Sequence, residues 1–251
     1  TKCGYLQQYP ETVAGIPGPA VFFDAERSPL NPHWFPLGSI LIYVMVISRS
    51  IVELFTEISA LDMRYVGRPL SALADVGSVF LLFLVGRRMY GQGVGLLAAG
   101  LAALAVIHIQ NSHFYRPETF SVLLTLASFW AMLRMVEHRR LRDSALLGLI
   151  VGMALAPKVN ILPLLLPLAL AYFYTLLDSV EGRWERITPR STLPMYGQAA
   201  LAAVIAVGVL ILSSPYALLD YDAFFDGIGS QVDMAREAGT LPFTIQYIDT
   251  P

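Results

Sequence analysis

Two long apolar runs, residues 69–86 and 93–109, constrain the fold of this chain more than any other feature. Each approaches the roughly 20 residues that a helix needs to cross a bilayer, and a tight turn carrying Arg87 and Arg88 joins them. Further apolar runs lie at 118–133, 144–157, 159–177 and 194–214. With 55% hydrophobic and 14% charged residues in 251, the chain has too little charge to cover a soluble domain. The pattern predicts an all-α, polytopic transmembrane helix bundle.

The arginines between the runs predict how the bundle is oriented. Nine of the 17 Lys and Arg residues fall in three alternate connections, which share one membrane side if each run crosses once. They are Arg87, Arg88, Arg134, Arg139, Arg140, Arg142, Arg183, Arg186 and Arg190. The positive-inside rule makes this side cytoplasmic. The other connections are therefore expected on the extracytoplasmic side.

Three segments are expected along the chain: an extracytoplasmic loop with a juxtamembrane helix (1–68), the transmembrane bundle (69–214) and a further extracytoplasmic segment (215–251). The abrupt start at Thr1 and stop at Pro251 favour part of a longer protein.

Residues 36–56 are apolar enough to span, but Arg49 and Glu53 lie among them at the i,i+4 spacing of a helix surface pair. A charge at the bilayer centre costs about 2.5–3.5 kcal/mol even on insertion scales. A helix lying at the membrane surface is therefore favoured. A true span whose charged side chains reach back to the interface is the alternative.

A polar cluster ends the second apolar run: Gln110, Asn111, His113, Arg116 and Glu118. Lys158 follows Pro157 inside another hydrophobic stretch and is expected on the same, extracytoplasmic side. A lone lysine among apolar residues usually reaches back to water. Next to the polar cluster, it also offers a fixed positive charge to a lipid phosphate.

The first 35 residues mix aromatic side chains with a few charged ones, among them Asp24, Glu26 and His33. This composition suits a sugar-binding loop, and equally a solvated loop whose aromatic rings rest on headgroups. The net charge of −2 gives no case for nucleic acid, and one cysteine, Cys3, permits no internal disulfide. The sequence contains no glycine-rich phosphate loop, zinc-ligand spacing or nucleophile elbow.

Several segments, taken in order, resemble the GT-C superfamily of glycosyltransferases. They are similar above all to bacterial members of the protein O-mannosyltransferase-like family, glycosyltransferase family 39. The segments are 23–32 (FDAERSPLNP), 67–73 (GRPLSAL), 86–91 (GRRMYG), 95–99 (GLLAA), 109–114 (IQNSHF) and 148–160 (GLIVGMALAPKVN).

This resemblance implies a hexosyltransferase of the bacterial inner membrane with an extracytoplasmic active site. Such an enzyme moves a mannose-like sugar from a polyprenyl-phosphate carrier to a hydroxyl of a protein, lipid or glycan, and inverts the anomeric centre. It implies a carboxylate base in the first outer loop, here Asp24 or Glu26. The family usually has an acidic pair after its first transmembrane helix; this chain has neither, and both are expected before Thr1. Glu118 stands where the family commonly has aspartate.

The resemblance also assigns substrate-binding roles. Arg116 and Lys158 are the expected phosphate partners, because cations stabilise the charge that gathers on the leaving group. His113 and Gln110 are expected to orient sugar or phosphate, and Arg68 to tie the outer loop to the bundle. No cofactor is implied beyond the lipid-linked donor, and a divalent metal is left open.

Two other functions remain alternatives: a multi-span transporter or permease, and a non-catalytic membrane scaffold. Transporters commonly place polar residues near the midplane on broken helices, often within an internal repeat. Here the charges gather at the outer surface and no repeat is visible. The sequence therefore favours the transferase.

Overall fold

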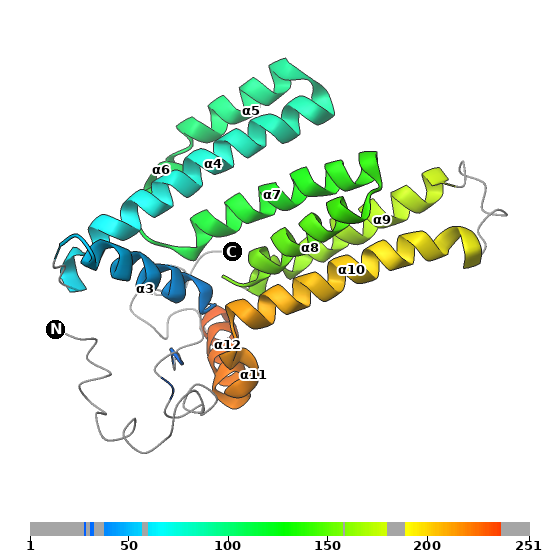
Figure 1. Cartoon of the computed structure of the whole chain (residues 1–251). Helices are drawn as coiled ribbons and strands as arrows, with labels where there is room; N and C mark the ends of the chain where they lie inside the picture. The colour runs from blue at the N-terminus through cyan, green and yellow to red at the C-terminus, as the bar shows by residue number, and fades with distance from the viewer. Residues whose placement is uncertain are drawn as a thin grey trace. The chain divides into compact units, whose positions relative to one another are not determined.

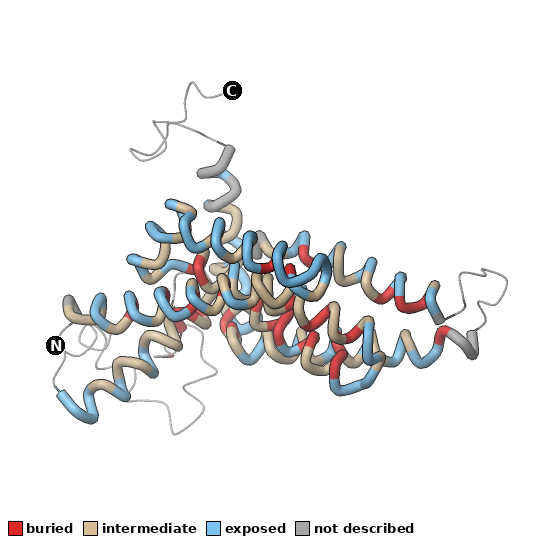
Figure 2. Tube along the Cα trace, turned by 90° about the horizontal axis from the view of Figure 1, so that it is seen from above, coloured by how far each residue is buried: buried red, intermediate tan, exposed pale blue. Residues whose placement is uncertain are grey.

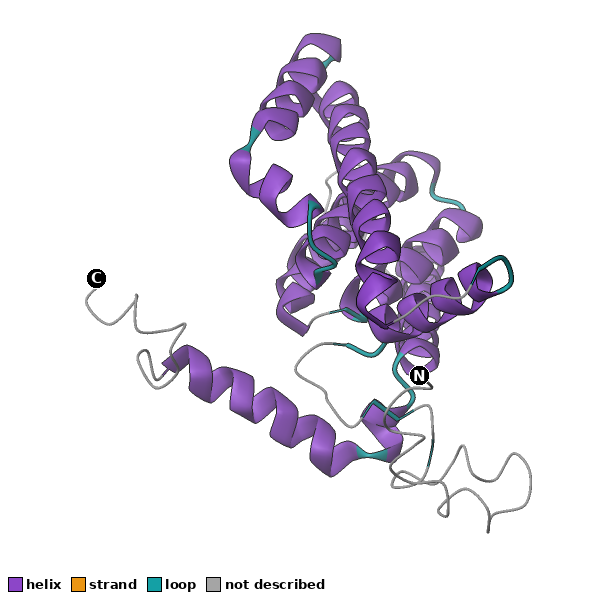
Figure 3. Cartoon of the chain, turned by 90° about the vertical axis from the view of Figure 1, so that its left-hand side faces the viewer, coloured by secondary structure: helices purple, strands orange, loops and turns teal. Residues whose placement is uncertain are grey.

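The structure is a computed structural model that describes residues 28, 31–32, 38–56, 60–157, 159–179 and 189–236. These residues form helices and connections, and no strand occurs among them (Figure 3). The chain divides into two compact units, Ile40–Ser213 and the two terminal segments together, Thr1–Ser39 with Ser214–Pro251. The all-α class is confirmed.

Most apolar runs of the sequence form helices long enough to cross a bilayer. These helices are α4 (Arg64–Tyr90), α7 (Pro117–His138), α10 (Pro189–Ser213), and residues Ile161–Asp178 of η3 (Val159–Leu164) with α9 (Leu165–Ser179). A fifth candidate is the pair α5 (Gln92–Leu104) and α6 (Val106–Ser112), which meet at a bend of 60°. The run 144–157 instead gives α8 (Leu141–Leu155), only 15 residues long. The polytopic membrane bundle is thereby confirmed.

Helix α3 (Ile40–Glu53) precedes the bundle, with the short 3-10 helix η2 (Ala60–Met63) between α3 and α4. The 14 residues of α3 rise about 21 Å, less than the roughly 30 Å of a hydrocarbon core. The expected pair is present, since Arg49 Nε donates to Glu53 Oε1 at 2.7 Å. The short length agrees with a helix at the membrane surface, which stays a prediction.

Successive helices of the larger unit run back and forth, so their ends gather at two opposite ends of the bundle (Figure 1). One of them, here called the arginine end, holds residues 87–91 and 139–140. The other, the polar end, holds residues 64–68, 113–116 and 156–157. This arrangement follows from the alternating helix directions.

The core of this unit is formed by residues of α7, α8, η3, α9 and α10, and Figure 2 shows where buried residues gather along the chain. The buried residues of this core are Ala131, Met132, Met135, Leu147, Ile150, Val151, Ala154, Leu164, Tyr172 and Ala202. On the α10 side, a Cβ at Gly148 would overlap the Ala202 carbonyl, and one at Gly152 the Ala206 carbonyl. The four-residue spacing of these glycines is a small-residue packing face, which lets two helix backbones touch.

A second glycine contact joins α4 to α5. A Cβ at Gly95 would lie 2.7 Å from the carbonyl oxygen of Phe83, and one at Gly86 would lie 3.0 Å from the Cα of Gly95. Gly91, with φ of 94°, ends α4 in a conformation that side chains disfavour. These glycines therefore serve a helix end and close helix packing.

The terminal unit contains α11 (Tyr216–Leu219) and α12 (Tyr221–Arg236). The hydroxyls of Ser28 and Tyr216 share a hydrogen bond, and Tyr216 is only 1% exposed. Asn31 Nδ2 donates to Asp220 Oδ2 at 2.7 Å. Residues near the two ends of the chain therefore bind each other.

Candidate functional site

The polar end presents exposed hydrogen-bonding and charged side chains from three parts of the bundle. Arg68 lies in the first turns of α4, and Gln110 lies in the last turn of α6; both are exposed. Glu118 is half-buried in the first turn of α7, where the helix dipole favours a carboxylate. The sequence predicted all three at one end, and the helix directions bring them there.

The connection between α6 and α7 supplies His113 and Arg116, both exposed. His113 Nδ1 lies 2.6 Å from the carbonyl oxygen of Ile109. Because a carbonyl can only accept, Nδ1 carries the proton, and Nε2 of a neutral ring is left as an acceptor. The Arg116 guanidinium lies 5.5 Å from the centre of the Phe114 ring, a cation–π distance.

Tyr115 anchors this connection to the rest of the polar end. Its hydroxyl donates to the carbonyl oxygen of Leu41 on α3 at 2.9 Å, and its ring packs edge-on against Phe120 at 5.3 Å. Burial raises the pKa of Tyr115 to about 12. The connection is therefore held at its middle, while Arg116 and His113 face outward.

Some arginines of the bundle pair with carboxylates and others do not; Arg87, Arg140 and Arg142 near the arginine end have no ion pair among the described residues. Near the arginine end, carboxylates from neighbouring helices pair with three arginines. These pairs are Arg88–Glu137, Arg134–Asp143 and Arg139–Asp178. At the polar end, no carboxylate of the described residues lies within ion-pair distance of Arg68 or Arg116. Their charge is available to an anionic ligand.

Asp24, Glu26 and Lys158 lie outside the described residues, so their roles stay predictions. Pro157, which ends the described segment after α8, lies at the polar end. Within the part of the chain that the structure describes, no group of three or more His, Cys, Asp and Glu side chains is arranged to hold a metal ion.

Sequence reasoning missed an ionisable pair inside the apolar helices. His108 Nδ1 on α6 lies 2.7 Å from Asp75 Oδ1 on α4, and the two side chains are only 25% and 18% exposed. Asp75 follows Arg68 by seven residues, so it lies about 10 Å deeper along α4. The available signal was an ionisable residue within each predicted span, which by default indicates function. The charges do not gather only at the surface.

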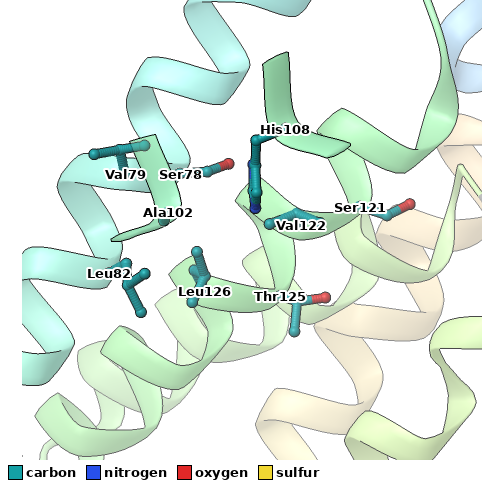
Figure 4. A pocket seen from close by; sticks show the side chains of 9 residues that line it. All are labelled: Ser78, Val79, Leu82, Ala102, His108, Ser121, Val122, Thr125 and Leu126. Carbon is teal, nitrogen blue, oxygen red and sulfur yellow. The ribbon is translucent and has the colours of Figure 1, made fainter. Parts of the chain in front are cut away.

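A pocket of about 370 Å³ opens beside this pair, between α4, the α5–α6 bend and α7. It is lined by Ser78, Val79, Leu82, Ala102, His108, Ser121, Val122, Thr125 and Leu126. Figure 4 shows the His108 ring reaching into the space between Ser78 and Val122. Mostly apolar walls with a few polar groups are typical of a small-molecule site. The buried Ser121 Oγ has no partner among the described residues.

The comparisons with known proteins identify the family. Neither the curated proteins nor the solved structures give a match. The family model described as dolichyl-phosphate-mannose-protein mannosyltransferase matches residues 46–212, which run from α3 to the end of α10 and include the polar end and the pocket. Since the match covers well over half of the chain, the protein belongs to the dolichyl-phosphate-mannose-protein mannosyltransferase family, the integral-membrane glycosyltransferases of GT-C type.

Proposed function

We propose that the polar end binds a hexose linked to polyprenyl phosphate and transfers the sugar to an acceptor hydroxyl on the extracytoplasmic side. One observation carries this proposal: in a chain of this family, the Arg116 guanidinium is exposed at one end of the bundle without a carboxylate partner among the described residues. A phosphate is the anion that a lipid-linked sugar would bring to such a cation. The neighbouring apolar pocket suits hydrocarbon.

The reaction is a single displacement that inverts the anomeric carbon. The acceptor oxygen attacks that carbon, while Asp24 or Glu26 takes the hydroxyl proton as general base. The bond from the anomeric carbon to the phosphate oxygen breaks, and its electron pair leaves with the lipid phosphate. The charge that develops on this oxygen is what cations at the site stabilise.

The proposed roles follow from the side chains at the polar end. Arg116 and Lys158 hold the phosphate. His113 Nε2 accepts a hydrogen bond from a sugar hydroxyl, since Nδ1 is occupied by the Ile109 carbonyl. Gln110 can both donate to and accept from the sugar, and the Glu118 carboxylate accepts from its hydroxyls. Arg68 ties the outer loop to the bundle.

Replacement of the phosphate-binding arginine tests this function. In the full-length protein in proteoliposomes, Arg116→Ala is expected to lower kcat/KM for transfer from polyprenyl-phosphate mannose by about 10- to 100-fold, the worth of a hydrogen bond to a charged group. Lys158→Ala is expected to act alike. Arg142→Ala, an exposed arginine on the far side of the bundle, is the matched control. Turnover equal to wild type in both polar-end variants would overturn the assignment.

The extracytoplasmic location is tested by labelling. We expect a cysteine placed at His113 in a Cys3→Ser background to react with a membrane-impermeant maleimide added outside bacterial cells. Reaction only after the cytoplasm is opened would reverse the proposed orientation, which rests on the positive-inside rule.

Transport is the second candidate, because the structure adds a specific observation in its favour. The α5–α6 helix pair is broken by a 60° bend, and the Asp75–His108 pair lies within the apolar helices. Broken helices and ionisable residues in the membrane are common in transporters. Movement of the lipid-linked sugar across the proteoliposome membrane without sugar transfer would favour transport. The family match favours sugar transfer.

A further inference from the structure

We propose that Asp75 and His108 are a positioning pair, which sets the angle of α6 against α4 and thereby fixes the polar-end residues that follow His108. This inference rests on the proposed function only for its link to turnover. The geometric part, that the pair fixes α6, stands on the contacts of the bundle itself.

Helix α6 depends on outside contacts for its orientation. It has seven residues, none of them buried, and a helix this short is marginal on its own. Ala105, with ψ of 122°, separates it from α5 and interrupts the helix hydrogen bonding. The 60° bend is therefore free to change unless side chains hold it.

Two hydrogen bonds tie α6 to neighbouring helices. One is the His108–Asp75 bond at 2.7 Å. The other is the bond from Thr119 Oγ1 on α7 to the Asn111 carbonyl oxygen at 3.3 Å, which is long for a hydroxyl donor. The first involves an ionisable acceptor in a partly buried place, where hydrogen bonds are stronger than in water. It is the main polar restraint on α6.

The pair also fixes the tautomer of the His108 imidazole. If the Asp75 carboxylate accepts from Nδ1–H, Nε2 of His108 is left as an acceptor, and the ring reaches into the pocket (Figure 4). The arrangement parallels the way carboxylates orient histidines in metal and catalytic sites. Here the hydrogen bond orients helix α6 as well as the His108 ring.

A small change in the angle between α5 and α6 moves the polar-end residues that follow the bend by several ångströms. Gln110 follows Ala105, where the bend lies, by five residues, about 7.5 Å along a helix, and His113 follows it by eight residues, about 12 Å. A change of about 20° in the bend would then move Gln110 by roughly 2–3 Å and His113 by roughly 4 Å, and a displacement of about 1 Å can already cost 100-fold in rate. Loss of the pair should therefore lower kcat while the donor still binds.

Exchange of the two residues is the test. In the full-length protein, we expect Asp75→Ala and His108→Ala each to lower kcat about 100-fold, with the donor KM changed less than threefold. The exchanged variant, Asp75→His with His108→Asp, is expected to recover to within tenfold of wild type. Glu137→Ala is the matched control, since it removes another interhelical pair of α4, with Arg88, and should leave kcat within twofold.

A distance measurement separates this inference from the proposed function. Spin labels at Leu73 and Ile107, exposed on α4 and α6, in a Cys3→Ser background should give a narrow distance distribution. We expect it to broaden in Asp75→Ala and to narrow again in the exchanged variant. Asp75→Asn, which keeps an acceptor oxygen, should stay narrow and replaces the exchanged variant if that one does not fold.

The outcomes are distinct. If the distance distribution broadens in Asp75→Ala but the wild type shows no sugar transfer, the proposed function is overturned and the positioning role of the pair is supported. A distance distribution that stays narrow in Asp75→Ala, or a kcat that the exchange does not restore while both single variants lose it, would overturn the positioning pair.

Discussion

Replacement of Gly148 by alanine tests whether α8 and α10 touch through their backbones. The added methyl would overlap the Ala202 carbonyl and lie 2.8 Å from the Cα of Ala202; at Gly152 it would lie 2.6 Å from the carbonyl oxygen of Ala206. Both contacts involve backbone, so only a separation of the helices relieves them. Overpacking of this kind costs about 1–3 kcal/mol, whereas alanine gains about 1 kcal/mol over glycine in a helix interior.

Gly148→Ala is therefore expected to destabilise the bundle by up to about 2 kcal/mol. The double variant with Gly152→Ala should lose less than twice that amount, because one separation of the helices relieves both overlaps. The measurement is reversible unfolding of the full-length protein in mixed detergent and SDS micelles, followed by the fraction of native helix.

Gly208→Ala on α10 is the matched control, since a Cβ there meets nothing within 4 Å. It should be neutral or stabilise by up to about 1 kcal/mol. If Gly148→Ala proved as stable as Gly208→Ala, the backbone contact between α8 and α10 would be refuted, and with it the packing that holds the core.

Three further predictions concern single contacts. Because burial raises the pKa of Tyr115 to about 12 from an ordinary value near 10, the stability that it contributes is present below pH 10 and is lost as pH rises through 12. Tyrosinate absorbance should show a group that ionises near pH 12 and that Tyr115→Phe removes. The Asp143 carboxylate is 2% exposed and accepts a hydrogen bond from Arg134 Nε at 2.6 Å, so Arg134→Ala leaves a buried carboxylate without its cation. The free energy of unfolding should fall by about 3 kcal/mol, the low end for a buried pair, because the Arg134 side chain is itself a third exposed. Glu137→Gln breaks a surface pair and should cost less than about 1 kcal/mol by the same assay.

The sequence predicted the helices well because bilayer thickness fixes both their length and their composition. The exception is instructive. The run 144–157 is as apolar as its neighbours, yet α8 stops at Leu155, since Pro157 removes a helix hydrogen bond and restricts the residue before it. Gly148 and Gly152 lie four residues apart in the sequence, a spacing typical of close helix packing.

The Asp75–His108 pair could not be predicted as a contact. It joins residues 33 apart across a bend at Ala105, and neither proline nor glycine marks that position: the neighbours are Leu104 and Val106. The arrangement of the polar end was easier, since alternating helix directions suffice to bring its exposed residues together. The candidate bases Asp24 and Glu26 and the candidate phosphate ligand Lys158 fall outside the described residues, so their roles remain predictions.

The bend between α5 and α6 also has a consequence for the surrounding lipid. The 13 residues of α5 rise about 20 Å, and α6, inclined by 60°, adds only about 5 Å of the roughly 10 Å of its own length. Together they fall about 5 Å short of a 30 Å hydrocarbon core. If this pair crosses as one span, we expect the bilayer to be thinner beside this edge of the bundle, which would shorten the path by which a lipid phosphate reaches the level of His108.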